Sequence, residues 1–261
     1  MPSQHSYAGD SAKPRARNLR RVRLELADGA TTTLHVATYR AERTDLRIVR
    51  LARRAPLEAW CATRGVREAM VGGFYVRPSG KPLGELRTRG MTRAHVPFAA
   101  PWGAERACVH VFRGEVRIAP RPEFGPAPRG DLLQAGPLLV RAGAKAVTDG
   151  VDPEGFSAAA HQFDSDITDG RYPRAALAVA GPRLLAVACD GRADDDAGLT
   201  LGELAEALLA LGATDALNLD GGGSTSLVCG GRLRNTPRQA HGIPVPGGRA
   251  IATALVFAAG G

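Results

Sequence analysis

Apolar and polar residues alternate over several short stretches of the chain, which is the pattern of strands with one buried face. The first three stretches cover residues 21–26, 33–38 and 46–51. The turn pair Asp28-Gly29 separates the first two and predicts a hairpin between them. Further strands are predicted at residues 69–75, 108–112, 116–119, 137–140, 175–180, 184–189, 216–219 and 251–257. The proline-rich residues 120–130 are predicted to form a loop.

Helical periodicity is clear in one stretch. Thr200 and Glu203 form a T-x-x-E capping box, and Gly212 provides the stop. Between them, apolar residues recur at helical spacing at Leu201, Leu204, Ala205, Leu208 and Leu211. A shorter helix is predicted at residues 56–64, opening with Pro56. Many short strands and few helices predict an α+β fold, a single domain of mostly antiparallel strands over residues 19–261. Residues 1–18 are predicted to be a flexible basic tail.

Composition narrows the class of protein. The 261 residues are 44% hydrophobic, enough for a sizeable core, and no stretch has the ~20 apolar residues of a membrane span. The four cysteines are far apart, which is poor spacing for zinc or a disulfide framework. The first twenty residues are polar and basic, without the apolar segment of a secretory signal. These features predict a cytoplasmic globular protein.

The net charge is +8, and nearly all basic residues are arginines, since only Lys13, Lys81 and Lys145 are lysines. A guanidinium presents a planar fork that suits phosphate and carboxylate oxygens. The excess therefore indicates an anionic partner, or reflects a compositional bias toward Arg, Ala and Gly. Aromatic residues make up only 5% of the chain, which argues against a stacking platform for single-stranded nucleic acid.

The most informative segment is a glycine-rich turn that follows the predicted strand 216–219. It contains Asp220, then Gly221, Gly222 and Gly223, then Ser224 and Thr225. Glycines leave no Cβ to keep a ligand away, and successive N–H groups in such a turn can cradle an anion. The GK[ST] ending of a P-loop and the GxGxxG pattern are both missing. The turn is therefore either a phosphate-binding candidate or a tight structural turn.

Residues 198–228, which include this turn, resemble the phosphodiester glycosidase family. Other segments agree in the same order: Met70-Val71-Gly72-Gly73-Phe74, Lys81-Pro82-Leu83-Gly84, Pro173-Arg174-Ala175-Ala176, Asp190-Gly191-Arg192 and the closing strand at residues 249–257. The resemblance spans roughly residues 20–258. It implies a hydrolase that cleaves a glycosyl phosphodiester, with a phosphorylated sugar or nucleoside as its small-molecule partner. Two positions depart from the family pattern, where Val71 and Ala175 replace Asn and Thr.

Splitting a sugar–phosphate bond requires a held phosphate and acid–base groups, which in glycoside hydrolysis are usually two carboxylates. Asp190 and Asp220 each end a predicted strand before a glycine, and we expect them to be the catalytic pair. A single essential carboxylate is the alternative, since a phosphate leaving group needs little protonation. Arg174 and Arg192 are the expected phosphate clamps. The remaining expected substrate contacts are Gly72, Gly73, Asn218 and the turn residues 221–225.

Other candidates are weaker. The run Asp194-Asp195-Asp196 fits a solvated loop better than a divalent cation site, so no metal or other cofactor is predicted. His161 with Asp164 and Asp166 is interpreted as a polar loop. Two functional alternatives stay open: a family member retooled for another phosphorylated sugar or nucleoside in small-molecule biosynthesis, and a non-catalytic module for anions or nucleic acid. The first is motivated by Val71 and Ala175, and the second by the basic tail.

Overall fold

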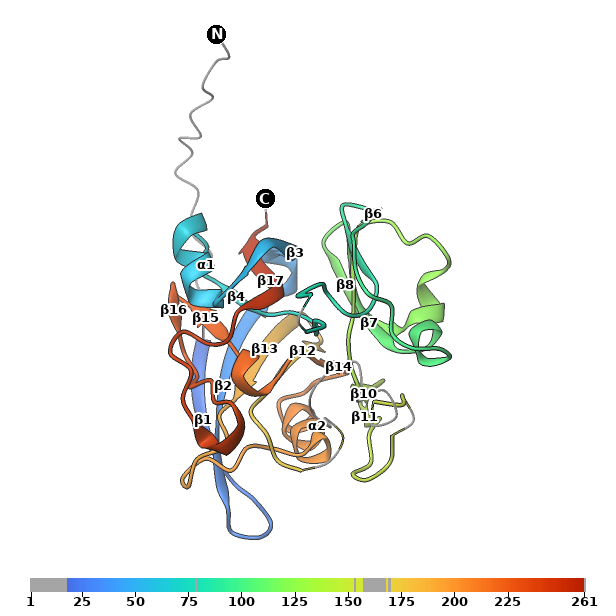
Figure 1. Cartoon of the computed structure of the whole chain (residues 1–261). Coiled ribbons are helices and arrows are strands. Elements are labelled where there is room, and N and C mark those ends of the chain that lie inside the picture. Colours follow the sequence, from blue (N-terminus) through green and yellow to red (C-terminus); the bar gives the residue numbers. More distant parts are fainter. Residues whose placement is uncertain (1–17, 78, 153, 157–167, 169, 261) are drawn as a thin grey trace.

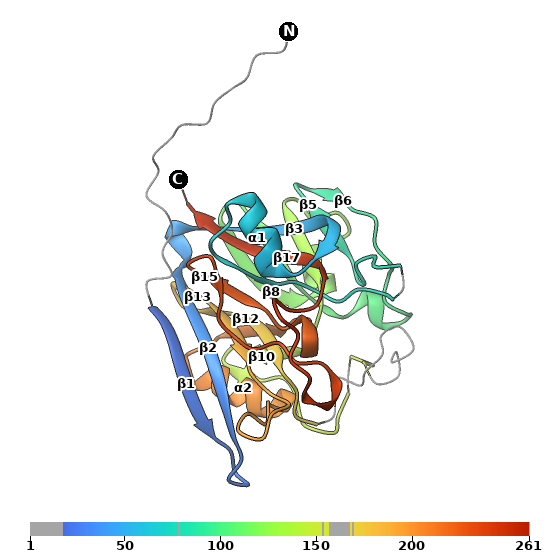
Figure 2. The ribbon, with the colours of Figure 1, turned by 60° about the vertical axis from the view of Figure 1, so that its left-hand side comes forward.

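The computed structural model describes residues 18–77, 79–152, 154–156, 168 and 170–260 (Figures 1 and 2). Almost all of the predicted tail, residues 1–17, lies outside this set. The described residues contain the α-helices α1 (Leu57–Arg64) and α2 (Leu201–Ala210). They also contain short 3-10 turns at Ala41–Arg43, Trp102–Ala104, Arg121–Phe124, Gly222–Ser224 (η5) and Ala240–Gly242.

The described strands form three sheets with antiparallel pairing. The central sheet has seven strands in the order β1-β2-β13-β12-β14-β10-β11. Their bounds are β1 Asn18–Glu25, β2 Thr31–Arg40, β10 Leu138–Arg141, β11 Ala144–Lys145, β12 Arg174–Ala180, β13 Arg183–Cys189 and β14 Asp215–Asn218. The predicted hairpin at Asp28-Gly29 is confirmed, because β1 pairs antiparallel with β2 from Glu25 opposite Thr31 onward.

The other two sheets have five strands each. The second sheet has the order β16-β15-β4-β17-β3, with β3 Thr44–Ala55, β4 Ala69–Val71, β15 Leu227–Cys229, β16 Arg232–Leu233 and β17 Ile251–Ala259. The third has the order β6-β5-β9-β7-β8, with β5 Leu86–Thr88, β6 Met91–Thr92, β7 Ala107–Phe112, β8 Glu115–Pro120 and β9 Asp131–Gln134. In Figure 1 the third sheet stands at the upper right, above β10 and β11 of the central sheet.

The inner strands β12 and β13 of the central sheet are buried on both faces, which explains their almost unbroken apolar sequences. Along β12, Ala175 and Leu177 face the main core shared with the second and third sheets. Ala176 and Ala178 face the opposite way and pack with Leu204 of α2 in a second core. Since successive side chains of a strand alternate between faces, one short strand serves both cores. This packing places the end of β14, and the turn after it, between the layers.

The fold is dominated by strands and is less clearly α+β than the sequence predicted. The predicted strand at residues 69–75 ends at Val71. Gly72 still donates its N–H to Thr253 O of β17, but the Gly73 N–H turns to the Thr253 side chain, which ends the regular pairing. Strands β5, β6, β9, β11, β15 and β16 were not predicted. Each has only two to four residues, too few to show a period. No helix in the described part of the chain is long and apolar enough to cross a membrane.

Candidate functional site

The glycine-rich turn is anchored by backbone hydrogen bonds to two neighbouring segments. The Asp220 N–H donates to Gly72 O over 3.0 Å, and the Leu219 N–H donates to Ala175 O over 2.8 Å. Within the turn, the Gly221 N–H donates to Asp220 Oδ1 over 2.9 Å. The next three residues close into η5. The strand ends of β14, β4 and β12 therefore fix the position of the Asp220 side chain.

The three glycines allow close approach by different neighbours. A Cβ on Gly221 would lie 2.9 Å from Pro173 O. On Gly222, whose φ is +59°, it would lie 3.1 Å from Arg192 Nη1, and on Gly223 it would lie 3.2 Å from Arg249 Nη2. Such contacts are tighter than ordinary packing, so side chains here would push the two guanidinium groups away. The turn thus holds Arg192 and Arg249 against its backbone.

This arrangement shifts the ionisation of the groups involved. Burial raises the pKa of Asp220 to about 6, against the lowering effects of the Ser224 hydroxyl, the Arg249 guanidinium and the Gly221 N–H. Burial and the nearby charge of Arg249 both lower the pKa of Arg192. No carboxylate among the described residues forms an ion pair with Arg192 or Arg249. The two cations therefore present an uncompensated positive field beside a carboxyl that titrates near neutral pH.

Asp190 lies in a different environment. It is buried, and both of its carboxylate oxygens accept hydrogen bonds: Oδ2 from His35 Nε2 over 2.7 Å and Oδ1 from the Thr236 N–H over 2.6 Å. These contacts tie strand β2 and the loop after β16 to the turn that carries Arg192. Arg192 itself has φ +59° and donates from Nη1 to Arg238 O over 3.2 Å.

Arg174 is buried at the start of β12 and donates to backbone carbonyls. Its Nε reaches Leu199 O over 2.6 Å, and its Nη2 reaches Gly170 O over 3.0 Å. Burial lowers its pKa to about 10. The ring of Tyr172 lies beside both predicted clamps, 5.5 Å from the Arg174 Cζ and 5.0 Å from the Arg192 Cζ. Arg192 thus lies against the glycine turn, whereas Arg174 is buried and binds backbone carbonyls of neighbouring segments.

Several predicted contacts are buried polar groups next to the turn. The side-chain amide of Asn218 donates to Gly136 O and Leu219 O. Its Oδ1 has no partner among the described residues, and the same holds for the buried hydroxyls of Thr225 and Ser226. Buried polar atoms normally find a partner, so this cluster has capacity for water or ligand hydrogen bonds.

The predicted Gly72 and Gly73 lie against β17. The Gly73 N–H donates to Thr253 Oγ1 over 3.0 Å, and a Cβ on Gly72 would meet that oxygen at 2.5 Å. The departures Val71 and Ala175 are fully buried in the main core. Both contribute backbone to the site, since the Val71 N–H donates to Ser226 O and Ala175 O accepts from the Leu219 N–H.

The weaker candidates stay apart from this turn. Asp196 pairs with Arg23 over 2.8 Å, and Asp194 and Asp195 are exposed. Within the described ranges, no three His, Cys, Asp or Glu side chains gather as a metal site. His161, Asp164 and Asp166 lie outside the described residues. The four cysteines are free and buried.

Sequence reasoning did not single out Arg249, Tyr172 or His35. Arg249 is one of 34 basic residues, and only its place at the start of the closing segment offered a signal. His35 precedes its partner Asp190 by 155 residues, so only the pairing of β2 with β13 brings the two together.

The family assignment follows from a match to the phosphodiester glycosidase family model over residues 64–258, about three quarters of the chain. The chain belongs to the phosphodiester glycosidase family. The resemblance inferred from the glycine-rich segment is therefore confirmed. A comparison with curated proteins finds no match.

Solved structures share the phosphodiester glycosidase fold. The catalytic domain of zebrafish N-acetylglucosamine-1-phosphodiester alpha-N-acetylglucosaminidase, auto-inhibited by its pro-peptide, is similar at TM-score 0.70 and 20% identity, over 98% of this chain and 85% of that one. A hypothetical protein from Synechocystis is similar at TM-score 0.61 and 19% identity, over 92% and 61% of the two chains.

A third structure, a putative exported protein from Burkholderia pseudomallei, is similar at TM-score 0.56 and 17% identity, over 88% of this chain and 74% of that one. This neighbour points away from the cytoplasm, and the prediction of a cytoplasmic protein is wrong. That prediction rested on the polar character of the first twenty residues, which carries no information about where this fold operates.

Proposed function

We propose that the protein hydrolyses a glycosyl phosphodiester, with Asp220 as its acid–base group and Arg192 and Arg249 holding the phosphate. The observation that carries this proposal is the Asp220 carboxyl, with a pKa near 6, on a glycine turn beside two guanidiniums that pair with no carboxylate of the described residues. The family supports the reaction class, and the zebrafish enzyme of the same fold is named for a phosphodiester substrate.

In the proposed reaction, a water molecule attacks the anomeric carbon while the Asp220 carboxylate accepts a proton from that water. The bond between the anomeric carbon and the phosphate oxygen breaks, and its electron pair goes to that oxygen. The phosphodiester carries one negative charge, and the phosphomonoester that leaves carries a second negative charge on the released oxygen. Guanidiniums placed beforehand stabilise this developing charge, which is the role we assign to Arg192 and Arg249.

The predicted pair of catalytic carboxylates becomes one in this proposal. Both oxygens of Asp190 already accept hydrogen bonds from His35 and the Thr236 N–H, so we assign it to positioning the turn that carries Arg192. Arg174 likewise braces backbone carbonyls, and we assign it the same supporting role.

The direct test is product analysis by phosphorus NMR and mass spectrometry on a panel of glycosyl phosphodiesters and sugar nucleotides. Wild type should release free sugar and a phosphomonoester. Asp220→Asn should lose about 10²–10⁴-fold in turnover, the usual contribution of a general base. Asp194→Asn is the matched control, since it removes an exposed carboxylate away from the turn. Equal turnover by Asp220→Asn and wild type would contradict the role of Asp220.

The pH profile gives a second prediction. A general base must be ionised, so kcat/KM should rise with pH and level off above about 6, the pKa of Asp220. Arg249 lowers that pKa, so Arg249→Gln should move the midpoint to higher pH. Arg20→Gln, which removes an exposed charge on β1, should leave the midpoint in place. A rate that falls as pH rises through 6 would instead make Asp220 a proton donor.

The alternatives give different results in the same assays. A family member retooled for another phosphorylated metabolite would leave every glycosyl phosphodiester unchanged. Val71 and Ala175, the positions that motivate this alternative, have their side chains in the main core. A non-catalytic anion-binding module would bind phosphorylated ligands in a salt-dependent way and keep that affinity in Asp220→Asn.

A further inference from the structure

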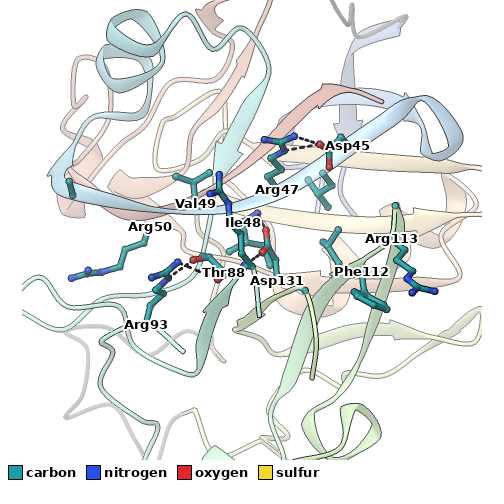
Figure 3. A pocket seen from close by; sticks show the side chains of 16 residues that line it. Asp45, Arg47, Ile48, Val49, Arg50, Thr88, Arg93, Phe112, Arg113 and Asp131 are labelled. Carbon is teal, nitrogen blue, oxygen red and sulfur yellow. Dashed lines mark hydrogen bonds and ion pairs between the residues drawn. The ribbon is translucent and has the colours of Figure 1, made fainter. Parts of the chain in front are cut away.

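A second basic feature lies outside the Asp220 turn. A groove of about 860 Å³ runs between the edge strand β3 and strands of the third sheet (Figure 3). Its apolar lining includes Leu46, Ile48, Val49, Val111 and Phe112. Its charged lining consists of five arginines, Arg47, Arg50, Arg89, Arg93 and Arg113, and two aspartates, Asp45 and Asp131.

Both aspartates have local partners. Asp45 pairs with Arg47 over 2.5 Å. Asp131 accepts the Ile48 N–H over 3.1 Å and the Arg89 N–H over 2.6 Å, which ties the β3 edge to the turn after β5. No carboxylate of the described residues forms an ion pair with Arg50, Arg89, Arg93 or Arg113. The groove therefore carries several uncompensated positive charges, which favour an anionic ligand.

Some of these cations are held in position. Arg93 donates to Thr88 through its Nε–H to Oγ1, and through Nη2 to the backbone oxygen over 3.3 Å. The Arg113 guanidinium lies 5.2 Å from the Phe112 ring centroid. Figure 3 shows Arg50 beside Arg93 at one end of the groove and Arg113 at the other, with Asp131 between them. A single phosphate would contact one end only, whereas an extended ligand with repeated charges could contact both.

The aromatic lining disfavours nucleic acid. Phe112 is the only aromatic side chain among the described lining residues. Its ring is already contacted by the guanidiniums of Arg113 and Arg129, at 5.2 and 5.1 Å from the centroid. Single-stranded nucleic acids depend on free aromatic faces for stacking. A phosphate-rich chain without bases matches the groove better.

The groove is close to the glycine turn through the second sheet. Arg50 pairs with Thr253 of β17, and Thr253 O accepts the Gly72 N–H over 2.9 Å. Gly72 O in turn accepts the Asp220 N–H. With strands about 4.8 Å apart, the backbone of Arg50 lies within about 10 Å of Gly72.

Basic side chains continue along this route. Arg54, on the same strand as Arg50, lies with its guanidinium 4.8 Å from the Tyr75 ring centroid. Two residues further on, the charge of Arg77 acts on the Asp220 carboxyl. Positive charge thus extends from the β3 groove toward the turn.

We propose that the β3 groove is a second anion site that binds an extended chain of repeated phosphate charges. The expected ligand is a phosphate-linked polymer that carries no nucleobases. The same polymer would also present the glycosyl phosphodiester to the Asp220 turn. This second role rests on the proposed function, whereas binding of the polymer in the groove does not.

The test is equilibrium binding of fluorescently labelled linear inorganic polyphosphate, followed by anisotropy at several salt concentrations. Wild type should bind, with an affinity that falls as salt rises. Arg50→Gln/Arg93→Gln should weaken binding about tenfold or more and lower the slope of log Kd against log salt by about 2. Arg20→Gln/Arg21→Gln removes the same charge from two exposed positions of β1 and should change neither quantity appreciably. Arg50→Gln alone, which breaks no described side-chain bond, should show half the change in slope.

Three results would overturn the proposal: no binding by wild type, equal weakening in the groove and control variants, or equally tight binding of single-stranded DNA with the same number of phosphates. Asp220→Asn should bind polyphosphate like wild type. If it does so while wild type cleaves no glycosyl phosphodiester, the groove proposal stands and the proposed function fails. If wild type cleaves the diester but binds no polyphosphate, the reverse holds.

Discussion

Asp220 combines two properties that oppose each other, a carboxyl largely shielded from water and a charge at neutral pH. Burial raises its folded-state pKa to about 6 from an ordinary value of 3.8. A carboxyl whose pKa is raised by folding binds its proton more tightly in the folded state. The folded protein therefore loses stability as pH rises through the window from about 4 to about 6, and above it the ionised group is a fixed cost.

We predict that Asp220→Asn is more stable than wild type at pH 7.5, by up to about 3 kcal/mol, which corresponds to the shift of about two pKa units. The gain should shrink as pH falls and vanish by about pH 3, where Asp220 is protonated in both states. Urea unfolding at a series of pH values measures it. The exposed Asp194→Asn variant should show no such pH-dependent gain. A loss of stability in Asp220→Asn at pH 7.5 would contradict the idea that the charge is unfavourable there.

At the residue scale, sequence reasoning singled out the contiguous part of the candidate site, residues 220–225, and it reached Arg192 through the resemblance of Asp190-Gly191-Arg192 to the family. The structure brings Arg192 against the glycines that follow Asp220. Three adjacent glycines lack Cβ atoms and therefore leave room for such close approach. Arg249 was missed because nothing local separates it from the other arginines. The partners of Asp190 were missed because His35 and Thr236 reach it through different sheets.

At the element scale, local rules succeeded where a whole motif is encoded. The capping box of α2 is confirmed, since Glu203 N–H donates to Thr200 Oγ1 over 3.1 Å and Thr200 N–H donates to Glu203 Oε2 over 2.9 Å. Strand β4 shows the limit. Its three residues lie between β15 and β17, which come more than 150 residues later, so its place in the sheet depends on long-range packing.

The end of β4 gives the element-scale prediction. A Cβ on Gly72 would lie 2.5 Å from Thr253 Oγ1 and 2.9 Å from the Thr253 backbone carbon. Gly72→Ala should therefore push β4 from β17, cost about 1–3 kcal/mol of stability, and displace the carbonyl that accepts the Asp220 N–H. Turnover should fall more than stability alone explains, as measured by activity well below the unfolding temperature.

Gly181→Ala is the matched control for that prediction. Gly181 has φ +59° in the turn between β12 and β13, and a Cβ there would meet nothing within 4 Å. Its cost, about 1–2 kcal/mol, comes from backbone conformation alone. The two variants should have similar stability and different activity. If Gly181→Ala loses as much activity as Gly72→Ala, the effect at Gly72 is a general loss of stability and not a shift of Asp220.

At the scale of the whole molecule, three sheets enclose one main core, and the strand ends and loops at their junctions carry the site. The short apolar runs at β12 and β13 predicted strands, but not that both faces of these two strands are buried. Nor do they indicate that β3 becomes an edge beside the third sheet, which creates the basic groove. The charge of +8 was readable from composition, whereas its concentration near β3 and the glycine turn required the fold.

This concentration of charge predicts the salt dependence of the proposed reaction. Arginines around the turn and the groove should attract an anionic substrate over distances that salt shortens, since the screening length falls from about 30 Å at 0.01 M to about 3 Å at 1 M. We expect kcat/KM for a glycosyl phosphodiester to fall steeply over that range, while kcat changes little. Once the substrate is bound, Arg192 and Arg249 act within the screening length at any salt.

Two charge-reversal variants separate local attraction from net charge. Arg50→Glu/Arg93→Glu and Arg20→Glu/Arg21→Glu lower the net charge equally, but only the first pair lines the groove. The groove pair should reduce kcat/KM at low salt several-fold more than the β1 pair, and the difference should close at high salt. Equal effects would mean that net charge alone steers the substrate. A flat salt dependence in wild type would mean that arrival of the anion does not limit kcat/KM, and the arginines would then act only on the bound phosphate.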